Sequence, residues 1–123
     1  MAVLTFSTSD IVSFLEARDF DAYDTLPFGV IALASDGVVV AYNAAEAALS
    51  GLTPSRVIGR NFFSAVAPCT NNFMVAHRFE SESELDETID YVFTLRMVPT
   101  PVRLRLLKRP GAARMYLLVD RKS

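Results

Sequence analysis

Three polar side chains recur at four-residue intervals where a predicted strand passes into a predicted helix. Tyr42, Glu46 and Ser50 are each one helical turn apart, so we expect their side chains to share one helix face. Polar groups that converge beside an apolar wall are typical of a small-ligand pocket. Glu46 also has a simpler interpretation, because the third position of a helix that begins after Asn43 suits a capping box. The sequence leaves both interpretations open.

Cys69 is the only cysteine, so the chain has neither an internal disulfide nor a cysteine-based metal cluster. A lone cysteine is often a small buried hydrophobe. Pro68 and Thr70, however, place this thiol in a predicted loop after a helix, where backbone amides favour a thiolate and covalent chemistry. A hydrolytic pair with His77, the only histidine, would require contact between the two side chains, which nothing in the sequence indicates.

Length and composition restrict the function classes. The chain has 123 residues, of which 51% are hydrophobic and 21% charged, which suits one globular domain with its own core. The longest apolar run, residues 27–34, is too short to span a bilayer. The first ten residues lack a signal-peptide pattern, so we expect a cytoplasmic protein that does not bind membranes. The net charge of −2 does not favour nucleic-acid binding.

Charge is unevenly placed along the chain. Residues 1–95 carry 4 basic and 13 acidic side chains, whereas residues 96–123 carry 8 and 1. The acids concentrate in residues 80–90, and the bases lie in the predicted C-terminal strands. A basic strand surface that faces an acidic segment within one fold explains this distribution, and a partner-docking face is the alternative.

Local patterns predict the elements of the N-terminal part. A short amphipathic helix, capped within residues 7–10 and ending near Asp19, forms a separate N-terminal cap. Two β-branched runs flank Ser35-Asp36-Gly37, which predicts a hairpin. Further helices are predicted by start and stop signals: one from Asn43 to Gly51, one from Pro54 to Gly59, one after Asn61, and one over residues 73–82 capped by Asn71 or Asn72.

Three strands are predicted to complete the chain. Apolar and polar residues alternate over 89–98 and again over 102–106, and a last strand follows Pro110-Gly111. The acidic segment before Tyr91 is expected to be a surface loop. The order of hairpin, short helices and three-stranded meander indicates an α+β fold, with a five-stranded antiparallel sheet and helices on one side. Phe62, Phe63 and Val66 are most simply residues of its core. No phosphate-binding loop, paired-histidine metal motif or serine nucleophile elbow is found, so we do not expect an enzyme.

These motifs together resemble the photoactive yellow protein family of blue-light photoreceptors, which have the Per-Arnt-Sim (PAS) fold. The residues that carry the resemblance are FG-I-L, DG, YNAAE, VIGRNFF, VAPCT, Phe93, Met97 and Pro99-Thr100. YNAAE and VAPCT at this separation are specific together, although either alone is weak. The resemblance implies one PAS-like domain over residues 1–123. It consists of an N-terminal helical cap (1–25) and a core (26–123) with a central five-stranded antiparallel sheet flanked by short helices.

The resemblance also implies a cofactor and its site. The family binds p-coumaric acid (4-hydroxycinnamic acid) as a thioester on the cysteine that matches Cys69, whose backbone holds the thioester carbonyl. Residues that match Tyr42 and Glu46 hydrogen-bond the phenolate oxygen, and Ser50 replaces a threonine that supports the tyrosine. Light-driven trans to cis isomerisation, proton transfer from Glu46 and partial unfolding would give the signal. Positions around the pocket match Ile31, Leu52, Phe62, Val66, Ala67, Pro68, Thr70, Phe93, Leu95 and Met97.

Two substitutions distinguish this chain from the best-known family members. Leu52 replaces an arginine near the phenolate end of the chromophore, and Leu95 replaces a tyrosine. Both changes make the pocket less polar, so we expect a higher chromophore pKa and altered recovery kinetics.

The partners and two alternative functions complete the sequence-based expectations. A downstream signalling protein of unknown identity is expected, with the chain a monomer or weak dimer. The first alternative is a PAS-like sensor module that binds another small ligand or only a protein partner. The second is a thiol enzyme that uses Cys69.

Overall fold

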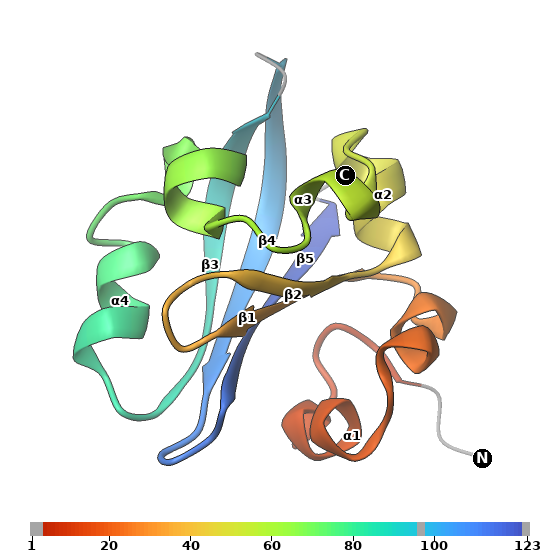
Figure 1. The fold of residues 1–123 in the computed structure, drawn as a ribbon, viewed down its shortest axis with the longest axis vertical. Coiled ribbons are helices and arrows are strands. Elements are labelled where there is room, and N and C mark those ends of the chain that lie inside the picture. The colour runs from red at the N-terminus through yellow and green to blue at the C-terminus, as the bar shows by residue number, and fades with distance from the viewer. Residues whose placement is uncertain (1–3, 96–97, 122–123) are drawn as a thin grey trace.

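A computed structural model describes residues 4–95 and 98–121 of the chain, without the side chains of residues 95 and 98. Its centre is one antiparallel sheet of five strands in the order β2-β1-β5-β4-β3 (Figure 1). The first and last strands are therefore neighbours in the middle of the sheet, and the predicted α+β fold is confirmed. The strands are β1 (Gly29–Ala34), β2 (Val39–Tyr42), β3 (Leu85–Leu95), β4 (Val98–Lys108) and β5 (Arg114–Arg121).

The predicted hairpin between β1 and β2 forms with the expected turn. Gly37 has a φ of 89°, a left-handed conformation that glycine adopts without strain. Its amide donates to the carbonyl of Ala34 at 2.9 Å, and the amide of Ala34 donates to Val38 at the same distance. The register pairs Ile31 with Tyr42, which places the end of β2 directly beside β1.

Short helices between β2 and β3 cover one face of the sheet (Figure 1). Asn43 and Asn61 cap the helices that follow them, and Gly51 ends the first of these with a φ of 75°, as predicted. The last helix is shorter than the predicted 73–82, although the side chain of Asn72 accepts from the amides of Met74 and Val75 before it. The helices are α2 (Ala44–Ser50), α3 (Pro54–Val57), the π-helical turn η2 (Phe62–Val66), the 3-10 turn η3 (Pro68–Thr70) and α4 (Ala76–Ser81).

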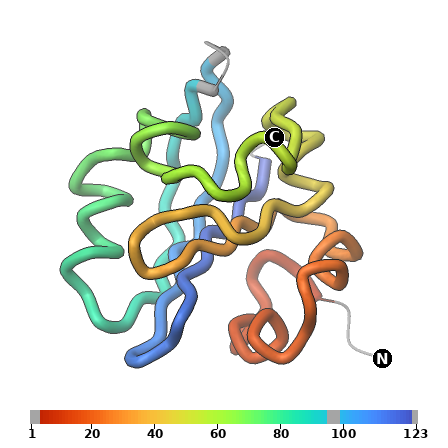
Figure 2. Tube along the Cα trace, viewed as in Figure 1, coloured from red at the N-terminus to blue at the C-terminus, as the bar shows by residue number. Residues whose placement is uncertain are grey.

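The N-terminal segment covers the opposite face of the sheet, so the expectation of helices on one side only is wrong. Its helix α1 (Ile11–Ala17) ends two residues earlier than predicted and is followed by the 3-10 helix η1 (Phe20–Thr25). Both faces of the sheet are apolar, because residues such as Val30, Leu107 and Leu118 are also buried. In Figures 1 and 2 this segment, drawn in red, lies beside the blue C-terminal strands. The division of the domain at residue 25 stays a prediction.

The acidic segment 80–90 is not a surface loop, because β3 begins at Leu85. Asp86 on β3 forms an ion pair with Arg105 on β4, and Glu87 forms one with Arg78 on α4. The Asp86 to Arg105 pair supports the interpretation of the charge asymmetry as pairing within one fold, whereas Arg78 lies outside the basic C-terminal strands. None of the helices in the described part of the chain is long and apolar enough to cross a membrane.

Candidate functional site

Asn43 fixes the junction between β2 and α2. Its side-chain oxygen accepts from the amides of Val30 at 2.9 Å and Glu46 at 3.0 Å. Its side-chain nitrogen donates to the carbonyls of Tyr23 at 2.9 Å and Phe28 at 3.0 Å. The side chain therefore joins η1, β1 and α2, and the sequence indicated only the part of this role that caps the helix. A buried side chain with all these partners holds the first turn of α2 in a fixed orientation.

Glu46 does not complete a capping box. The amide of Asn43, which a capping glutamate would accept from, instead donates to the carbonyl of Val30 at 3.1 Å. The carboxyl of Glu46 is fully buried, with Oε2 at 3.5 Å from the hydroxyl of Tyr42, and Oε1 has no hydrogen-bond partner. Burial raises the pKa of Glu46 to about 8. The side chain is thus a neutral acid at pH 7, with a proton available to donate.

Gly29, which sequence reasoning missed, makes room for this carboxyl. A Cβ at position 29 would lie 2.2 Å from Oε1 of Glu46, closer than any non-bonded contact allows. The first residue of β1 must therefore be glycine for Glu46 to keep this position. The only sequence signal was the glycine at the start of a buried strand, which marks a close approach of another group.

Tyr42 and Ser50 meet as predicted, although they do not share a helix face, because Tyr42 ends β2 and Ser50 lies at the end of α2. The hydroxyl of Tyr42 donates to Oγ of Ser50 at 2.8 Å, and the same oxygen accepts from the amide of Leu52 at 3.1 Å. Burial, and secondarily the charge of Glu46, raise the pKa of Tyr42 above its ordinary value. Tyr42 therefore keeps its proton and acts as a hydrogen-bond donor beside Glu46.

Cys69 lies in the middle of η3 and not in an irregular loop, because Pro68 begins a 3-10 turn here. Within this turn the amide and hydroxyl of Thr70 both donate to the carbonyl of Ala67, at 2.9 and 2.7 Å. Cys69 is half-buried and packs against the core cluster that contains Tyr42. The thiol of Cys69 and the side chain of Tyr42 therefore meet the same apolar cluster, although the two residues are 27 positions apart in the sequence.

Two further residues, Tyr91 and Asn72, hold the backbone at Cys69 and were not anticipated. The carbonyl of Cys69 accepts a hydrogen bond from the Tyr91 hydroxyl and another from Nδ2 of Asn72 at 3.2 Å. Asn72 and Tyr91 also contact each other at 2.6 Å. A polar residue among the alternating apolar positions of β3 was the only sequence signal for Tyr91.

The structure brings most of the predicted pocket residues together. They share the core cluster that lies between the sheet and the helices of the α2 to α4 region, whereas Pro68 is exposed. Met97 and the side chain of Leu95 lie outside the described residues. Of the predicted residues, the cluster contains Ile31, Tyr42, Phe62, Ala67 and Phe93, and the partly buried Leu52, Val66 and Cys69 pack against it.

His77 does not form a catalytic pair with Cys69. Its side chain is exposed on α4, and no hydrogen bond between it and the thiol is found among the described residues. The hydrolytic pair considered from the sequence therefore has no geometric support.

Comparison with known proteins defines the class of this site. The PAS fold family matches residues 18–111, more than half of the chain. A solved structure, the photoactive yellow protein domain from the sensor histidine kinase Ppr of Rhodospirillum centenum, superposes with a TM-score of 0.80 at 37% identity. The match covers 89% of this chain and 98% of that domain. The chain is therefore a PAS-fold protein.

Curated relatives narrow the class to one family. The photoactive yellow protein of Rhodothalassium salexigens is 34% identical in an alignment of 124 positions that covers 98% of this chain and 99% of the relative. That of Halochromatium salexigens is 37% identical in an alignment of 111 positions that covers 88% of this chain and 89% of the relative. The chain belongs to the photoactive yellow protein family.

Proposed function

We propose that this PAS-fold sensor is a blue-light photoreceptor in which Cys69 carries p-coumaric acid (4-hydroxycinnamic acid) as a thioester. One observation carries the proposal: the buried Oε1 of Glu46 has no partner, beside the hydroxyl of Tyr42 and on the same apolar cluster as the thiol. Buried polar atoms are normally satisfied. A phenolate oxygen bound between the two donors would explain why this carboxyl is kept in the core.

Hydrogen bonds from the two donors are strong enough to keep such a phenolate ionised. A phenol has an ordinary pKa near 10, so holding it ionised at pH 7 takes ~4 kcal/mol, and burial adds to this cost. Hydrogen bonds to charged groups contribute ~1.5 to 3 kcal/mol each, so two are of the right size. Glu46 can be one of them because its pKa of about 8 keeps it protonated at pH 7. Tyr42 would be the other, since its raised pKa keeps its hydroxyl neutral and the proton that it donates to Ser50 would turn to the phenolate.

Residues around Cys69 would hold the attachment end. Tyr91 and Asn72 fix the carbonyl of Cys69, and Thr70 closes the η3 turn. The sulfur is thereby presented from a rigid segment at the edge of the apolar cluster. Phe62 and Phe93, both buried in that cluster, would exclude water from the bound group.

The bound chromophore would supply absorption of blue light and a trans to cis isomerisation. Glu46 would give up its proton once its bound partner was no longer aligned with it. The carboxylate left behind would be fully buried, with no ion pair among the described residues. An unpaired buried charge costs several kcal/mol, which is comparable with the whole stability of a small domain. Local unfolding would relieve this cost.

The N-terminal segment is the part that we expect to loosen. Its α1 helix has only seven residues, and an isolated helix of that length is unstable in water without a docked face. The altered surface would be read by a downstream signalling protein of unknown identity. The cytoplasmic location and the monomeric or weakly dimeric state remain predictions.

Reconstitution with the anhydride of p-coumaric acid tests attachment. The sulfur of Cys69 attacks the anhydride carbonyl, a thioester forms, and p-coumarate leaves with the electron pair of the broken bond. We expect a yellow product whose added mass maps to Cys69 and which is absent from Cys69→Ser. A colourless, unmodified chain would favour the sensor module without this chromophore. Turnover of an ester or peroxide that Cys69→Ser abolishes would favour the thiol enzyme.

Illumination of the reconstituted protein tests the proton step. Glu46→Gln keeps a hydrogen-bond donor at this position but has no acidic proton to transfer. We therefore expect a coloured protein with a shifted absorption maximum. Light should accelerate hydrogen exchange of the N-terminal segment in the wild type but not in this variant. Glu80→Gln, an exposed change on α4, is the matched control and should behave as the wild type. Equal light-induced exchange in Glu46→Gln and wild type would refute the mechanism.

A further inference from the structure

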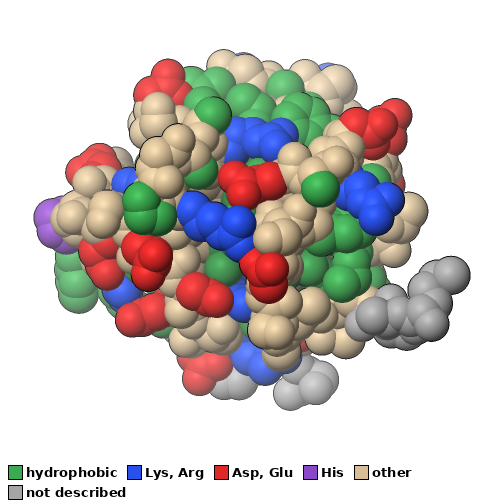
Figure 3. All heavy atoms as spheres, turned by 90° about the horizontal axis from the view of Figure 1, so that it is seen from below, with side chains coloured by type: hydrophobic (Ala, Val, Ile, Leu, Met, Phe, Trp, Pro, Cys, Tyr) green, Lys and Arg blue, Asp and Glu red, His purple; other side chains and the backbone are tan. Residues whose placement is uncertain are grey.

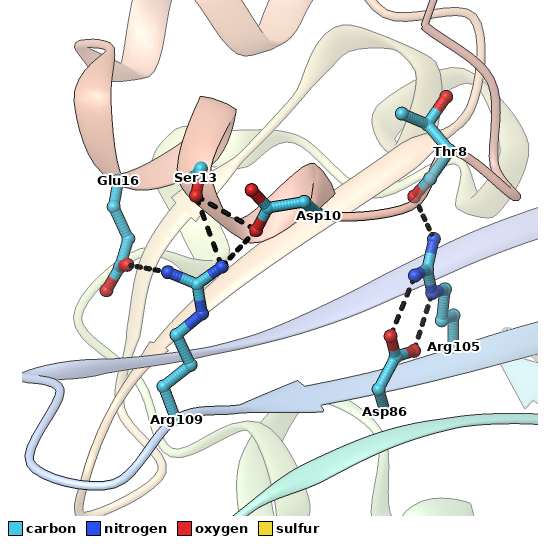
Figure 4. Close-up of polar contacts among 7 residues, drawn as sticks. All are labelled: Thr8, Asp10, Ser13, Glu16, Asp86, Arg105 and Arg109. Atoms are coloured by element: carbon cyan, nitrogen blue, oxygen red, sulfur yellow. Dashed lines mark hydrogen bonds and ion pairs between the residues drawn. The ribbon is translucent and has the colours of Figure 1, made fainter.

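The N-terminal segment, residues 4–17, is fastened to β4 by a buried arginine on the sheet face opposite the candidate site. Arg105 is only 6% exposed. Its Nε and Nη2 donate to the two carboxylate oxygens of Asp86 at 2.8 and 2.9 Å. Its Nη1 donates to the backbone carbonyl of Phe6 at 3.0 Å and to that of Thr8 at 2.7 Å, the second of which is drawn in Figure 4. One guanidinium thus joins β3, β4 and the N-terminal segment.

The planar guanidinium of Arg105 carries enough donors to serve the carboxylate of Asp86 and the two backbone carbonyls at the same time. If the N-terminal segment left the sheet, Arg105 would keep Asp86 but lose the carbonyls of Phe6 and Thr8. A buried charge bound through two backbone carbonyls fixes the path of the chain as well as its attachment.

A second arginine holds α1 at its first turns. Arg109 donates through Nη2 to the carboxylate of Asp10 and, at 3.2 Å, to Oγ of Ser13, and through Nη1 to Glu16 at 3.3 Å (Figure 4). The side chain of Arg109 is 40% exposed, in contrast to that of Arg105. Salt therefore screens this cluster far more than it screens the buried contact.

The helix α1 lacks the usual stabilising features at its own ends. Asp10 occupies the N-cap position of α1, but its φ is 55° and its side chain caps no helix amide. Its carboxylate contacts Arg109 and Ser13 instead. The helix has no acidic residue in its first turn and no basic residue in its last. With seven residues and no cap, α1 depends on the sheet for its existence.

A groove of about 430 Å³ lies between α1 and the β3-β4 edge. Charged side chains line much of it, among them Asp10, Asp86, Arg105, Lys108 and Arg109. Figure 3 shows basic and acidic side chains interleaved over the face of the molecule seen from below. Water thus reaches this side of the junction, where polar contacts hold the segment in addition to the buried side chains of Phe6, Ile11 and Leu15.

We propose that Arg105 and Arg109 form a two-part latch that sets how readily the N-terminal segment leaves the sheet in the resting protein. Arg105 is the buried anchor, and Arg109 is the exposed clasp that responds to ionic strength. The latch is a property of the chain in the dark. Only its use in signalling rests on the proposed function, so its test requires no illumination.

Hydrogen exchange of the full chain in the dark tests the anchor. Arg105→Met keeps much of the aliphatic volume but removes all four hydrogen bonds. We expect the amides of α1 to exchange about tenfold faster or more, the factor expected for loss of one charge-assisted hydrogen bond. Amides of β1 and β5 should keep their wild-type rates. Arg78→Met is the matched control, because Arg78 pairs with Glu82 and Glu87 away from the N-terminal segment.

Three results would refute the role of Arg105 as the anchor. They are a wild-type exchange rate of α1 in Arg105→Met, an equal acceleration of α1 in Arg78→Met, and an acceleration in Arg105→Met that is as large throughout the sheet as in α1. Asp86→Asn provides a milder variant that keeps the guanidinium and its bonds to the N-terminal carbonyls. It should accelerate exchange in α1 by a smaller factor than Arg105→Met. A larger factor in Asp86→Asn would contradict the assignment of the anchor to the carbonyl contacts.

The dependence of hydrogen exchange on salt concentration tests the role of Arg109 as the clasp. Between ~0.1 and ~1 M NaCl the Debye length falls from ~10 to ~3 Å, so we expect α1 of the wild type to exchange severalfold faster at the higher concentration. Arg109→Gln should show fast exchange at both concentrations and little further response. An equal salt response in Arg109→Gln and wild type would refute the clasp, and so would a salt response that disappears in Arg105→Met but persists in Arg109→Gln.

Discussion

Glu46→Gln removes a titrating group from the core and therefore changes how the free energy of unfolding depends on pH. In the folded chain burial raises the pKa of Glu46 to about 8, whereas its ordinary value is 4.5. Between these values the folded chain holds a proton that the unfolded chain has released. The free energy of unfolding of the wild type must therefore fall as the pH rises. This contribution is fully present below pH 4.5 and is lost once the pH passes 8.

The magnitude follows from the pKa of the buried carboxyl. At about 1.4 kcal/mol for each pH unit, the rise from 4.5 to about 8 corresponds to about 5 kcal/mol. Small domains have free energies of unfolding of ~5 to 15 kcal/mol, so this one residue controls a large share of the total. Glutamine has a similar shape and does not titrate, so its chain lacks this dependence.

Urea unfolding of the chain without chromophore, at about pH 5 and about pH 8, measures this effect as a difference between variants. The other titrating groups are common to both chains and cancel. Because this interval spans about three of those pH units, we expect wild type to lose up to ~4 kcal/mol more than Glu46→Gln. Glu80→Gln, exposed on α4, should follow the wild type. Parallel pH dependences for wild type and Glu46→Gln would refute the claim that the carboxyl is buried as a neutral acid.

Three further substitutions test the surroundings of the site. Gly29→Ala would place a methyl group on Oε1 of Glu46, so we expect a loss of ~1 to 3 kcal/mol in thermal or urea unfolding, and unchanged stability would contradict the close approach. Tyr91→Phe removes one of the two donors to the Cys69 carbonyl; we expect a loss of ~1 kcal/mol and faster maleimide labelling of the thiol, and an unchanged labelling rate would argue against this positioning role. Leu52→Arg in the reconstituted protein should lower the chromophore pKa, because a nearby cation favours the phenolate, and acid bleaching at an unchanged or higher pH would oppose this.

Features set by neighbouring residues were predictable from the sequence. The hairpin at Gly37, the caps at Asn43 and Asn61 and the end of α2 at Gly51 all form as expected. Each depends on a side chain or a φ angle within a few positions of the residue concerned. The Tyr42 to Ser50 contact was expected from helical spacing, but Tyr42 ends β2 and only Ser50 lies on α2, so the junction between the strand and the helix brings the two together.

Features set by contacts between distant segments were not predictable. The buried Arg105 is one residue in an alternating strand pattern that resembles a solvent-facing position. Nothing local indicates that the N-terminal segment, about 100 residues away, covers it. The same reason explains the missed role of Gly29, whose significance comes from the carboxyl of Glu46, and that of Tyr91, which meets Cys69 only in the folded chain.

Asn43 and Glu46 show why the candidate site differs from ordinary core structure. Both are buried polar residues at the start of α2, but Asn43 has four hydrogen bonds, whereas Oε1 of Glu46 has none. A residue selected for stability alone would be apolar at position 46, since a neutral carboxyl with a vacant acceptor weakens the core. Gly29 adds to this cost by giving up a side chain in β1 so that the carboxyl fits. The fold thus gives up stability at two positions to hold one exchangeable proton beside Tyr42, as the proposed proton transfer requires.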